Sequence, residues 1–281
     1  MNIYIFSFVD SKEPLILYHF LKYYCDYLKI ENVKIILHTE EDDENRKKCL
    51  EYLNKYNIIP TLINKYSSDV KKEYVNNFIN ELNNDDWLIY PDNDEFFDFP
   101  YNDLNKFLTE CDEQNINIVR GVFNDRICSN YELKKIRKEE SIWNQYPYEI
   151  TKLGISKFFG ASYHKICACK AKYQYWNSHW LKEEIENKGR HDVIKKIQLG
   201  ALIERNPHYL KYYKNILKVH HFRCNDLLYE KLKRRINLIG NYSNKQCCID
   251  YYEKIFNNII LKDDKKFLKI PYDLKKSIIK Y

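Results

Sequence analysis

The sequence predicts an α/β fold in which a mixed sheet is flanked by helices, within a single domain that ends in a helical tail. Over the first hundred residues, apolar runs typical of strands alternate four times with amphipathic runs typical of helices. Such alternation indicates a largely parallel sheet, because parallel neighbours need a long crossover connection between them. The chain has 281 residues and is 44% hydrophobic, which is enough to form a core for such a sheet.

The first half of the chain is the more regular. Its expected strands are short apolar runs at 2–9, 33–38, 58–63 and 87–90. Helices are expected to begin at Pro14, in the acidic run 40–44 and near Val70. Proline suits a first helical turn because its missing N–H would be unpaired there. Acidic residues are favourable at the same, positive end of a helix.

Beyond residue 100 the alternation loosens. Residues 131–150 show no regular period and are expected to be irregular. Residues 254–281 are rich in Lys and carry aliphatic residues at helical spacing, which predicts a packed helical tail. The remaining expected elements are helices at 101–113 and 226–239 and strands at 116–122, 165–172 and 217–221.

Composition limits the classes of function. There are 46 Lys and Arg against 40 Asp and Glu, for a net charge of +6. Charges of both signs are interspersed, so nucleic acid is not expected as a partner. The nine cysteines have no paired spacing of the kind that holds zinc, and free thiols are typical of a reducing compartment. The excess of Asn, Lys, Ile and Tyr is typical of AT-rich coding in a viral or microbial source.

No stretch of the sequence predicts a targeting or membrane segment. The N-terminus lacks the basic flank and the small-residue cleavage site of a signal peptide. No apolar run approaches the ~20 residues that a transmembrane helix needs. We therefore expect a soluble, cytoplasmic protein.

The stretch 87–100 carries the strongest functional signal. Its first four residues are apolar, and Asp92, Asp94 and Glu95 follow soon after them. Ligands of α/β sheets bind beyond the carboxyl ends of the strands, and side chains two residues apart in an extended chain point the same way. We therefore expect Asp92 and Asp94 to converge on one Mg²⁺ or Mn²⁺ ion. The competing interpretation is a solvated turn, but the apolar strand before the carboxylates and Phe96-Phe97 after them favour the metal site.

Five segments, taken in order along the chain, resemble one family. They are Asp92-Asn93-Asp94-Glu95-Phe96, Arg120-Gly121 with Asp125-Arg126, Ser141-Ile142-Trp143-Asn144-Gln145-Tyr146-Pro147, the Lys165 strand with His179, and Val219-His220-His221-Phe222-Arg223. Their order resembles that of the GT-A glycosyltransferases, which are Rossmann-like and hold a divalent metal on a nucleotide-sugar diphosphate with an Asp-x-Asp motif. The first segment is similar to the D-x-D-E-F motif of a family-2-like group of that fold. The matches extend over about residues 3–240.

This resemblance implies a division of the chain. Residues 1–240 form a GT-A domain, in which 1–100 is the nucleotide-binding half and 101–240 the acceptor half. Residues 241–281 are expected to be a basic helical extension packed on the same domain. The resemblance also implies that Asp94 is the direct metal ligand and that Asp92 lies near the ribose or the waters of the metal.

Two histidines at the end of the last expected strand are candidates to complete the metal site. Alternation sends His220 and His221 to opposite faces, so only one of them is expected to bind, and we favour His220. For either residue a packed, purely structural histidine is the competing interpretation. The predicted metal ligands are thus Asp92, Asp94 and His220.

Inversion at the sugar requires a base for the acceptor hydroxyl. Asp125 is the first candidate because it is expected to follow a strand end, although an ion pair with Arg126 that only braces the loop is an equal alternative. Glu149, His179 and Asp192 are the other candidates for the base. The residues expected to bind the nucleotide and its phosphates are Phe8, Val9, Asp10, Asp69, Asp92, Asn93, Arg126, Lys165 and Arg223.

The predicted function is that of a metal-dependent glycosyltransferase of the hexosyltransferase type. It would use Mn²⁺ or Mg²⁺ and move a sugar from a nucleotide-diphosphate donor, expected to be UDP-linked, to a hydroxyl of a glycan or another acceptor. A nucleotidyltransferase or phosphotransferase is one alternative, but residues 7–14 lack the Gly-rich phosphate loop typical of that class. A non-catalytic carbohydrate-binding scaffold is the other, and the intact carboxylates and histidines argue against it.

Overall fold

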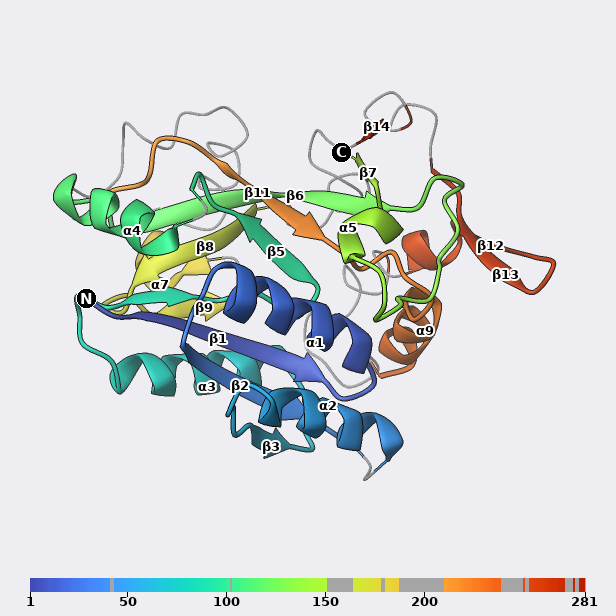
Figure 1. Ribbon diagram of the computed structural model, residues 1–281, viewed down its shortest axis with the longest axis horizontal. Helices are drawn as coiled ribbons and strands as arrows, with labels where there is room; N and C mark the ends of the chain where they lie inside the picture. Colours follow the sequence, from blue (N-terminus) through green and yellow to red (C-terminus); the bar gives the residue numbers. More distant parts are fainter. Residues whose placement is uncertain are drawn as a thin grey trace. The chain divides into compact units, whose positions relative to one another are not determined.

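The computed structural model describes most of the chain (Figure 1). The described residues are 1–40, 43–101, 103–150, 164–177, 180–186, 210–238, 250, 253–270, 275 and 278–280. The chain divides into two compact units. Unit 1 comprises residues 1–122 and 164–219, and unit 2 comprises residues 123–163 and 220–281.

Unit 1 contains the predicted alternation of strands and helices. Its elements are β1 (Ile3–Asp10), α1 (Pro14–Leu21), the π-helix η1 (Lys22–Tyr27), β2 (Asn32–His38), α2 (Glu44–Asn54), β3 (Thr61–Ile63), α3 (Ser68–Asn80), β4 (Trp87–Ile89), β5 (Glu95–Asp98), α4 (Leu104–Glu113), β8 (His164–Lys170), β9 (Tyr175–Asn177), β10 (Trp180–Leu181) and α7 (Lys182–Glu186). The four strands expected before residue 91 and the three helical connections between them are confirmed.

The sheet of unit 1 is mixed. Its strand order is β3-β2-β1-β4-β8, followed by the first part of β6 (Ile118–Ile127). The pairs β3-β2, β2-β1 and β1-β4 are parallel, whereas β8 is antiparallel to both β4 and β6. The predicted mixed α/β sheet flanked by helices is therefore confirmed. Its parallel strands end at one edge, where Asp10 is in register with His38.

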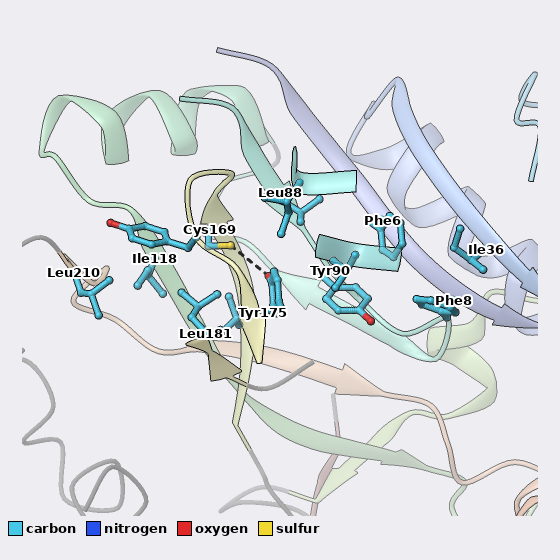
Figure 2. Packing of buried hydrophobic residues seen from close by; sticks show 14 residues of the cluster. Phe6, Phe8, Ile36, Leu88, Tyr90, Ile118, Cys169, Tyr175, Leu181 and Leu210 are labelled. Carbon is cyan, nitrogen blue, oxygen red and sulfur yellow. Dashed lines mark hydrogen bonds between the residues drawn. The ribbon is translucent and has the colours of Figure 1, made fainter. Parts of the chain in front are cut away.

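Alternation along β1 distributes its side chains to two faces of the sheet. Phe6 and Phe8 pack against Val75 and Ile79 of α3, in a cluster that also contains Tyr90 (Figure 2). Successive side chains of a strand point to opposite faces, so the odd-numbered residues of β1 face away from α3. Helices α1 and α2 pack on each other, and both begin after parallel strands, as crossover helices do.

Strand β6 is longer than expected. The sequence predicted a strand that ends at Val122, but β6 continues to Ile127, so Asp125 and Arg126 lie within a strand and do not follow one. The first part of β6 belongs to unit 1 and the second part to unit 2. Gly121, at the end of the first part, approaches its neighbours so closely that an added Cβ would lie 2.6 Å from the Cys167 sulfur.

Unit 2 is built on the second part of β6. There β6 pairs antiparallel with β7 (Tyr148–Ile150), and β7 pairs antiparallel with β14 (Ile278–Lys280). The expectation that 131–150 is irregular was wrong at its end, where α5 (Ile142–Gln145) and β7 form. The other elements are the end of β11 (Leu217–His221), α9 (Leu228–Leu238), β12 (Ile259–Lys262) and β13 (Lys265–Leu268).

The expected helical tail is wrong over residues 259–268. These residues form an antiparallel hairpin in which β12 pairs with β13. Its two-residue turn is Asp263-Asp264, and both residues have positive φ angles, of 50° and 59°. Two successive positive φ angles match the twist of a tight hairpin, and Asp tolerates them better than most residues. The turn chemistry therefore overrode the helical spacing of the aliphatic residues.

Among the described residues, no helix is both long enough and apolar enough to span a lipid bilayer.

Candidate functional site

The carboxylates of the stretch 87–100 lie in a turn. Strand β4 ends at Ile89, and the N–H of Glu95 then donates to the backbone oxygen of Asp92 at 3.0 Å, which closes the turn from Asp92 to Glu95. The expectation of an extended segment was wrong here, so alternation does not set the directions of Asp92 and Asp94. Both are nevertheless withdrawn from solvent, with Asp94 9% exposed and the Asp92 side chain 26% exposed.

Two lysines converge on the Asp92 carboxylate. Lys71, in the first turns of α3, brings its Nζ to 2.6 Å from Oδ1, and Lys165, in β8, brings its Nζ to 3.6 Å from Oδ2. The Lys165 side chain is fully buried, whereas that of Lys71 is 15% exposed. Lys165 was predicted to meet phosphate, and the structure brings it to this turn.

Electrostatics at this turn favours the charged forms. Burial alone would raise the pKa of Asp92, but the ammonium groups of Lys165 and Lys71 outweigh it and lower that pKa below its usual value. Burial likewise favours a neutral Lys71, yet the Asp92 carboxylate raises the pKa of Lys71 well above its usual value. At neutral pH the site therefore contains a charged Asp92 carboxylate with the ammonium groups of Lys71 and Lys165 next to it.

Glu95 and Asn93 brace the turn from inside. The Glu95 carboxylate accepts the backbone N–H of Asp92 at 2.9 Å and lies 2.8 Å from Lys165 Nζ. The amide of Asn93 donates to Oε2 of the buried Glu13 at 3.3 Å. Asn93 was predicted to bind the nucleotide sugar, and one N–H of its amide is used in this hydrogen bond within the protein.

Aromatic rings lie next to the two lysines. Lys71 Nζ is 5.6 Å from the centre of the Phe8 ring and 5.2 Å from that of Tyr66, and Lys165 Nζ is 5.4 Å from that of Tyr90. The Tyr90 ring packs edge-on against Phe6 and belongs to the buried row shown in Figure 2. Its hydroxyl is buried and has no hydrogen-bond partner among the described residues.

Four more of the residues predicted to bind the nucleotide, Phe8, Val9, Asp10 and Asp69, belong to unit 1 and lie in β1 or at the start of α3. Phe8 and Val9 are buried in β1, at 3% and 1% exposure. Asp10 ends β1 and accepts the backbone N–H of Lys12 at 3.0 Å. Asp69 is exposed in the first turn of α3, two residues before Lys71.

The donor set of this turn suits a hard divalent cation. Asp92 and Asp94 offer carboxylate oxygens, the ligands that such cations prefer. The Lys71 ammonium group already lies 2.6 Å from Asp92 Oδ1, so this oxygen has a cation as its neighbour. No group of three or more His, Cys, Asp or Glu side chains in the described part of the chain has the geometry of a complete metal site. Asp92 and Asp94 would therefore form part of a coordination shell that further ligands complete.

In unit 2, Asp125 is enclosed by basic partners. Its side chain is fully buried, and Oδ1 lies 3.0 Å from His221 Nδ1 and 3.0 Å from Arg223 Nε. The His221 ring stacks at a tilt on Phe123, with centroids 4.8 Å apart. Asp125 and Arg126 are successive residues of β6, so alternation directs their side chains to opposite faces of the strand.

Arg126 belongs to a second buried group. Its Nε donates to the Tyr146 backbone oxygen at 3.0 Å, and its Nη1 lies 3.6 Å from Glu149 Oε2. His220 Nδ1 lies 3.5 Å from the same Glu149 oxygen, and the His220 ring meets Trp143 edge-on. Asp92 and Asp94 belong to unit 1 and His220 to unit 2, so their joint role at a metal stays a prediction. His179 and Asp192 lie outside the described residues.

Lys71 was not among the site residues predicted from the sequence, although α3 carried a signal for it. Lys71, Val75 and Ile79 are spaced by four residues and therefore share one helical face. Val75 and Ile79 are buried against the sheet, so the side chain one turn earlier is directed along the same surface. Lys72 lies off this face, and its Nζ is 4.5 Å from the ring centre of Trp176.

Comparisons with known proteins give structural likenesses only. No family model and no curated protein matches the sequence. Among the solved structures that are similar to this chain, three illustrate the low identity. The first 349 residues of TarS from S. aureus are 14% identical, with 92% of this chain and 71% of that chain covered and a TM-score of 0.38. A Bacillus anthracis protein, with an inferred glucose-1-phosphate thymidylyltransferase activity in its name, is 11% identical, with a TM-score of 0.38. The match covers 82% of this chain and 93% of that chain. A Desulfovibrio desulfuricans G20 protein, described as an inferred nucleotide-diphospho-sugar transferase, is 10% identical, with a TM-score of 0.37. The match covers 90% of this chain and 98% of that chain.

Proposed function

We propose that this protein is a metal-dependent glycosyltransferase that uses a nucleotide-diphosphate sugar, expected to be UDP-linked, and transfers the sugar to a hydroxyl acceptor. The observation that supports this most is the turn from Asp92 to Glu95. It follows a parallel strand at the ligand-binding edge of an α/β sheet, and two lysines meet one of its carboxylates.

The balance of charge at this turn supports a need for a divalent cation. Lys71 and Lys165 contribute two positive charges, and Asp92, Asp94 and Glu95 contribute three negative charges in their ordinary ionised forms. The excess of one negative charge disfavours an anionic diphosphate. Adding a divalent cation reverses the sign of the sum and makes the site attractive to a diphosphate.

The chemistry of transfer asks for stabilised negative charge. As the bond between the sugar and the diphosphate breaks, negative charge grows on the departing phosphate, and fixed cations nearby lower the barrier. A bound Mn²⁺ or Mg²⁺, held by Asp92 and Asp94, would supply Lewis acidity for the leaving diphosphate. The buried Lys165 keeps the Asp92 carboxylate charged and oriented.

The base of the reaction is a separate part of this proposal. Asp125 stays our candidate for the base that takes the acceptor proton in an inverting transfer. His221 and Arg223 hold its carboxylate in a single orientation through contacts of 3.0 Å each. His220 stays the candidate for a further metal ligand.

Turnover of a panel of nucleotide sugars tests the proposal. We expect the wild type with Mn²⁺ to release a nucleoside diphosphate and the free sugar from at least one donor, and to stop when the metal is chelated. Release of inorganic diphosphate from a nucleoside triphosphate and a sugar phosphate would instead identify a nucleotidyltransferase. Absence of both activities, together with metal-independent carbohydrate binding, would identify a scaffold.

The variant Asp94→Ala assigns the activity to the turn. Loss of a metal ligand removes several kcal/mol of charge stabilisation, so we expect turnover to fall by roughly a hundredfold or more. The matched control is Asp85→Asn, an exposed aspartate just before β4. It should keep wild-type turnover, and both variants should melt near the wild-type temperature. Wild-type turnover in Asp94→Ala would refute the assigned metal role.

A further inference from the structure

We propose that Lys71 binds the diphosphate of the nucleotide donor, and that in the free protein its ammonium group takes the place of a cation at Asp92. This inference rests on the function proposed above and adds one named residue to its donor site.

The ammonium group of Lys71 has bonding capacity to spare. A lysine ammonium has three N–H donors, and the one acceptor that Lys71 meets among the described residues is Asp92 Oδ1, at 2.6 Å. Its other sides face the rings of Phe8 and Tyr66, which attract a cation without accepting a conventional hydrogen bond. Donors therefore remain for the oxygens of a ligand.

Accessibility distinguishes the two lysines at this turn. The Lys165 side chain has no exposed surface and is held by both Glu95 and Asp92, which makes it a structural cation. Lys71 retains 15% exposure, and Asp92 retains 26%. A ligand that arrives from solvent thus meets Lys71 and Asp92, and these two side chains carry opposite charges.

The position of Lys71 on α3 allows it to change partners. Val75 and Ile79 anchor the same helical face in the core, so the backbone beneath Lys71 is held in place. The side chain itself is a flexible four-carbon stem that carries a compact charge. Its ammonium group can therefore move from a carboxylate oxygen to a phosphate oxygen while the helix stays where it is.

The Tyr90 hydroxyl is a second sign that a ligand belongs here. It is buried and has no hydrogen-bond partner among the described residues. The charges of Lys71 and Asp92 act on it electrostatically, so it lies close to both. Leaving a buried hydroxyl without a partner is unfavourable, and a hydrogen bond to a ligand or to its water would remove that penalty.

These two roles of Lys71 predict effects of opposite sign from one substitution. Lys71→Met removes a cation that competes for Asp92, so Mn²⁺ alone should bind more tightly. The same substitution removes a charged donor to the diphosphate, so a nucleoside diphosphate should bind less tightly. A charged hydrogen bond corresponds to a change of roughly tenfold or more in each dissociation constant. A residue that only supports the fold would not produce this pair of changes.

Equilibrium binding by titration calorimetry tests the inference on the full-length chain. We would titrate Mn²⁺ alone, then uridine diphosphate and uridine in the presence of saturating Mn²⁺, with guanosine and adenosine diphosphates in parallel. Lys72→Met is the matched control, because Lys72 is the next residue of α3 and its ammonium group lies over Trp176. Lys71→Gln repeats the comparison with a polar side chain if the methionine variant does not fold.

We expect Lys71→Met to bind Mn²⁺ roughly tenfold more tightly and the diphosphate roughly tenfold less tightly, with uridine itself and the Lys72→Met variant unchanged. Wild-type diphosphate affinity in both Lys71 variants, or unchanged Mn²⁺ affinity, would overturn this inference but would leave the proposed function standing. A wild type that binds no nucleoside diphosphate at all would instead refute the proposed function.

Discussion

Replacing Glu95 by glutamine removes a charge that neutralises the fully buried Lys165. Lys165 Nζ lies 2.8 Å from Glu95 Oε2, and the two side chains are 0% and 2% exposed. Glutamine keeps the shape and can still accept the Asp92 N–H, so the variant tests charge with little change in packing. We expect a marked loss of stability without loss of the fold.

The size of that loss follows from the geometry. Two unit charges 2.8 Å apart attract by about 6 kcal/mol at an effective dielectric constant near 20. Asp92, 3.6 Å from Lys165, keeps part of this attraction, and the glutamine oxygen still accepts a hydrogen bond. We therefore expect Glu95→Gln to lower the free energy of unfolding by about 3 kcal/mol, near the low end of the 3–5 kcal/mol typical of a broken buried pair.

Urea unfolding followed by tryptophan fluorescence measures this difference. The double variant Glu95→Gln/Lys165→Met removes both charges and should recover more than half of the loss, because no uncompensated ammonium group then stays buried. Glu44→Gln is the matched control, since its pair with Lys47 is solvent-exposed and should contribute less than about 0.5 kcal/mol. A loss below about 1 kcal/mol for Glu95→Gln would show that our assignment of a charged, tightly paired Lys165 is wrong.

Two further predictions concern packing and thiol chemistry. Gly121→Ala places a Cβ 2.6 Å from the Cys167 sulfur and 2.7 Å from Val219 Cγ2, so it should destabilise the protein by about 1–3 kcal/mol in the same urea assay; an unchanged unfolding midpoint would contradict this close approach. Burial raises the pKa of Cys49 to about 12 and that of Cys111 to about 12, so both thiols should resist alkylation in the folded protein at pH 8. Mass spectrometry of peptides alkylated with and without urea measures this, and labelling of either cysteine at equal rates in both conditions would refute it.

Local sequence was sufficient to predict the first half of the fold. The strands and helices from β1 to β4 repeat a short pattern in which each apolar run is followed by a helix start, such as Pro14 or the acidic residues before α2. Each signal lies within the element that it predicts, so no distant residue is needed to interpret it.

The longer β6 and the C-terminal hairpin could not be predicted in this way. Residues 123–127 extend β6 because β7 supplies a partner, with Asp125 opposite Ile150. A strand that ends in buried polar residues has no local period that distinguishes it from a loop. The hairpin of β12 and β13 depends on two positive φ angles at Asp263 and Asp264, which oppose the helical spacing around them.

The sequence by itself determined which residues make the turn after β4 acidic and that this turn lies at the ligand-binding edge of an α/β sheet. It did so because an apolar strand followed by carboxylates is a pattern of adjacent residues. Only the tertiary structure decided that Lys71 and Lys165 meet Asp92, since these residues are far apart in the chain. Their pairing follows from the packing of α3 and β8 in unit 1, because a buried carboxylate needs opposite charges that its own segment does not contain.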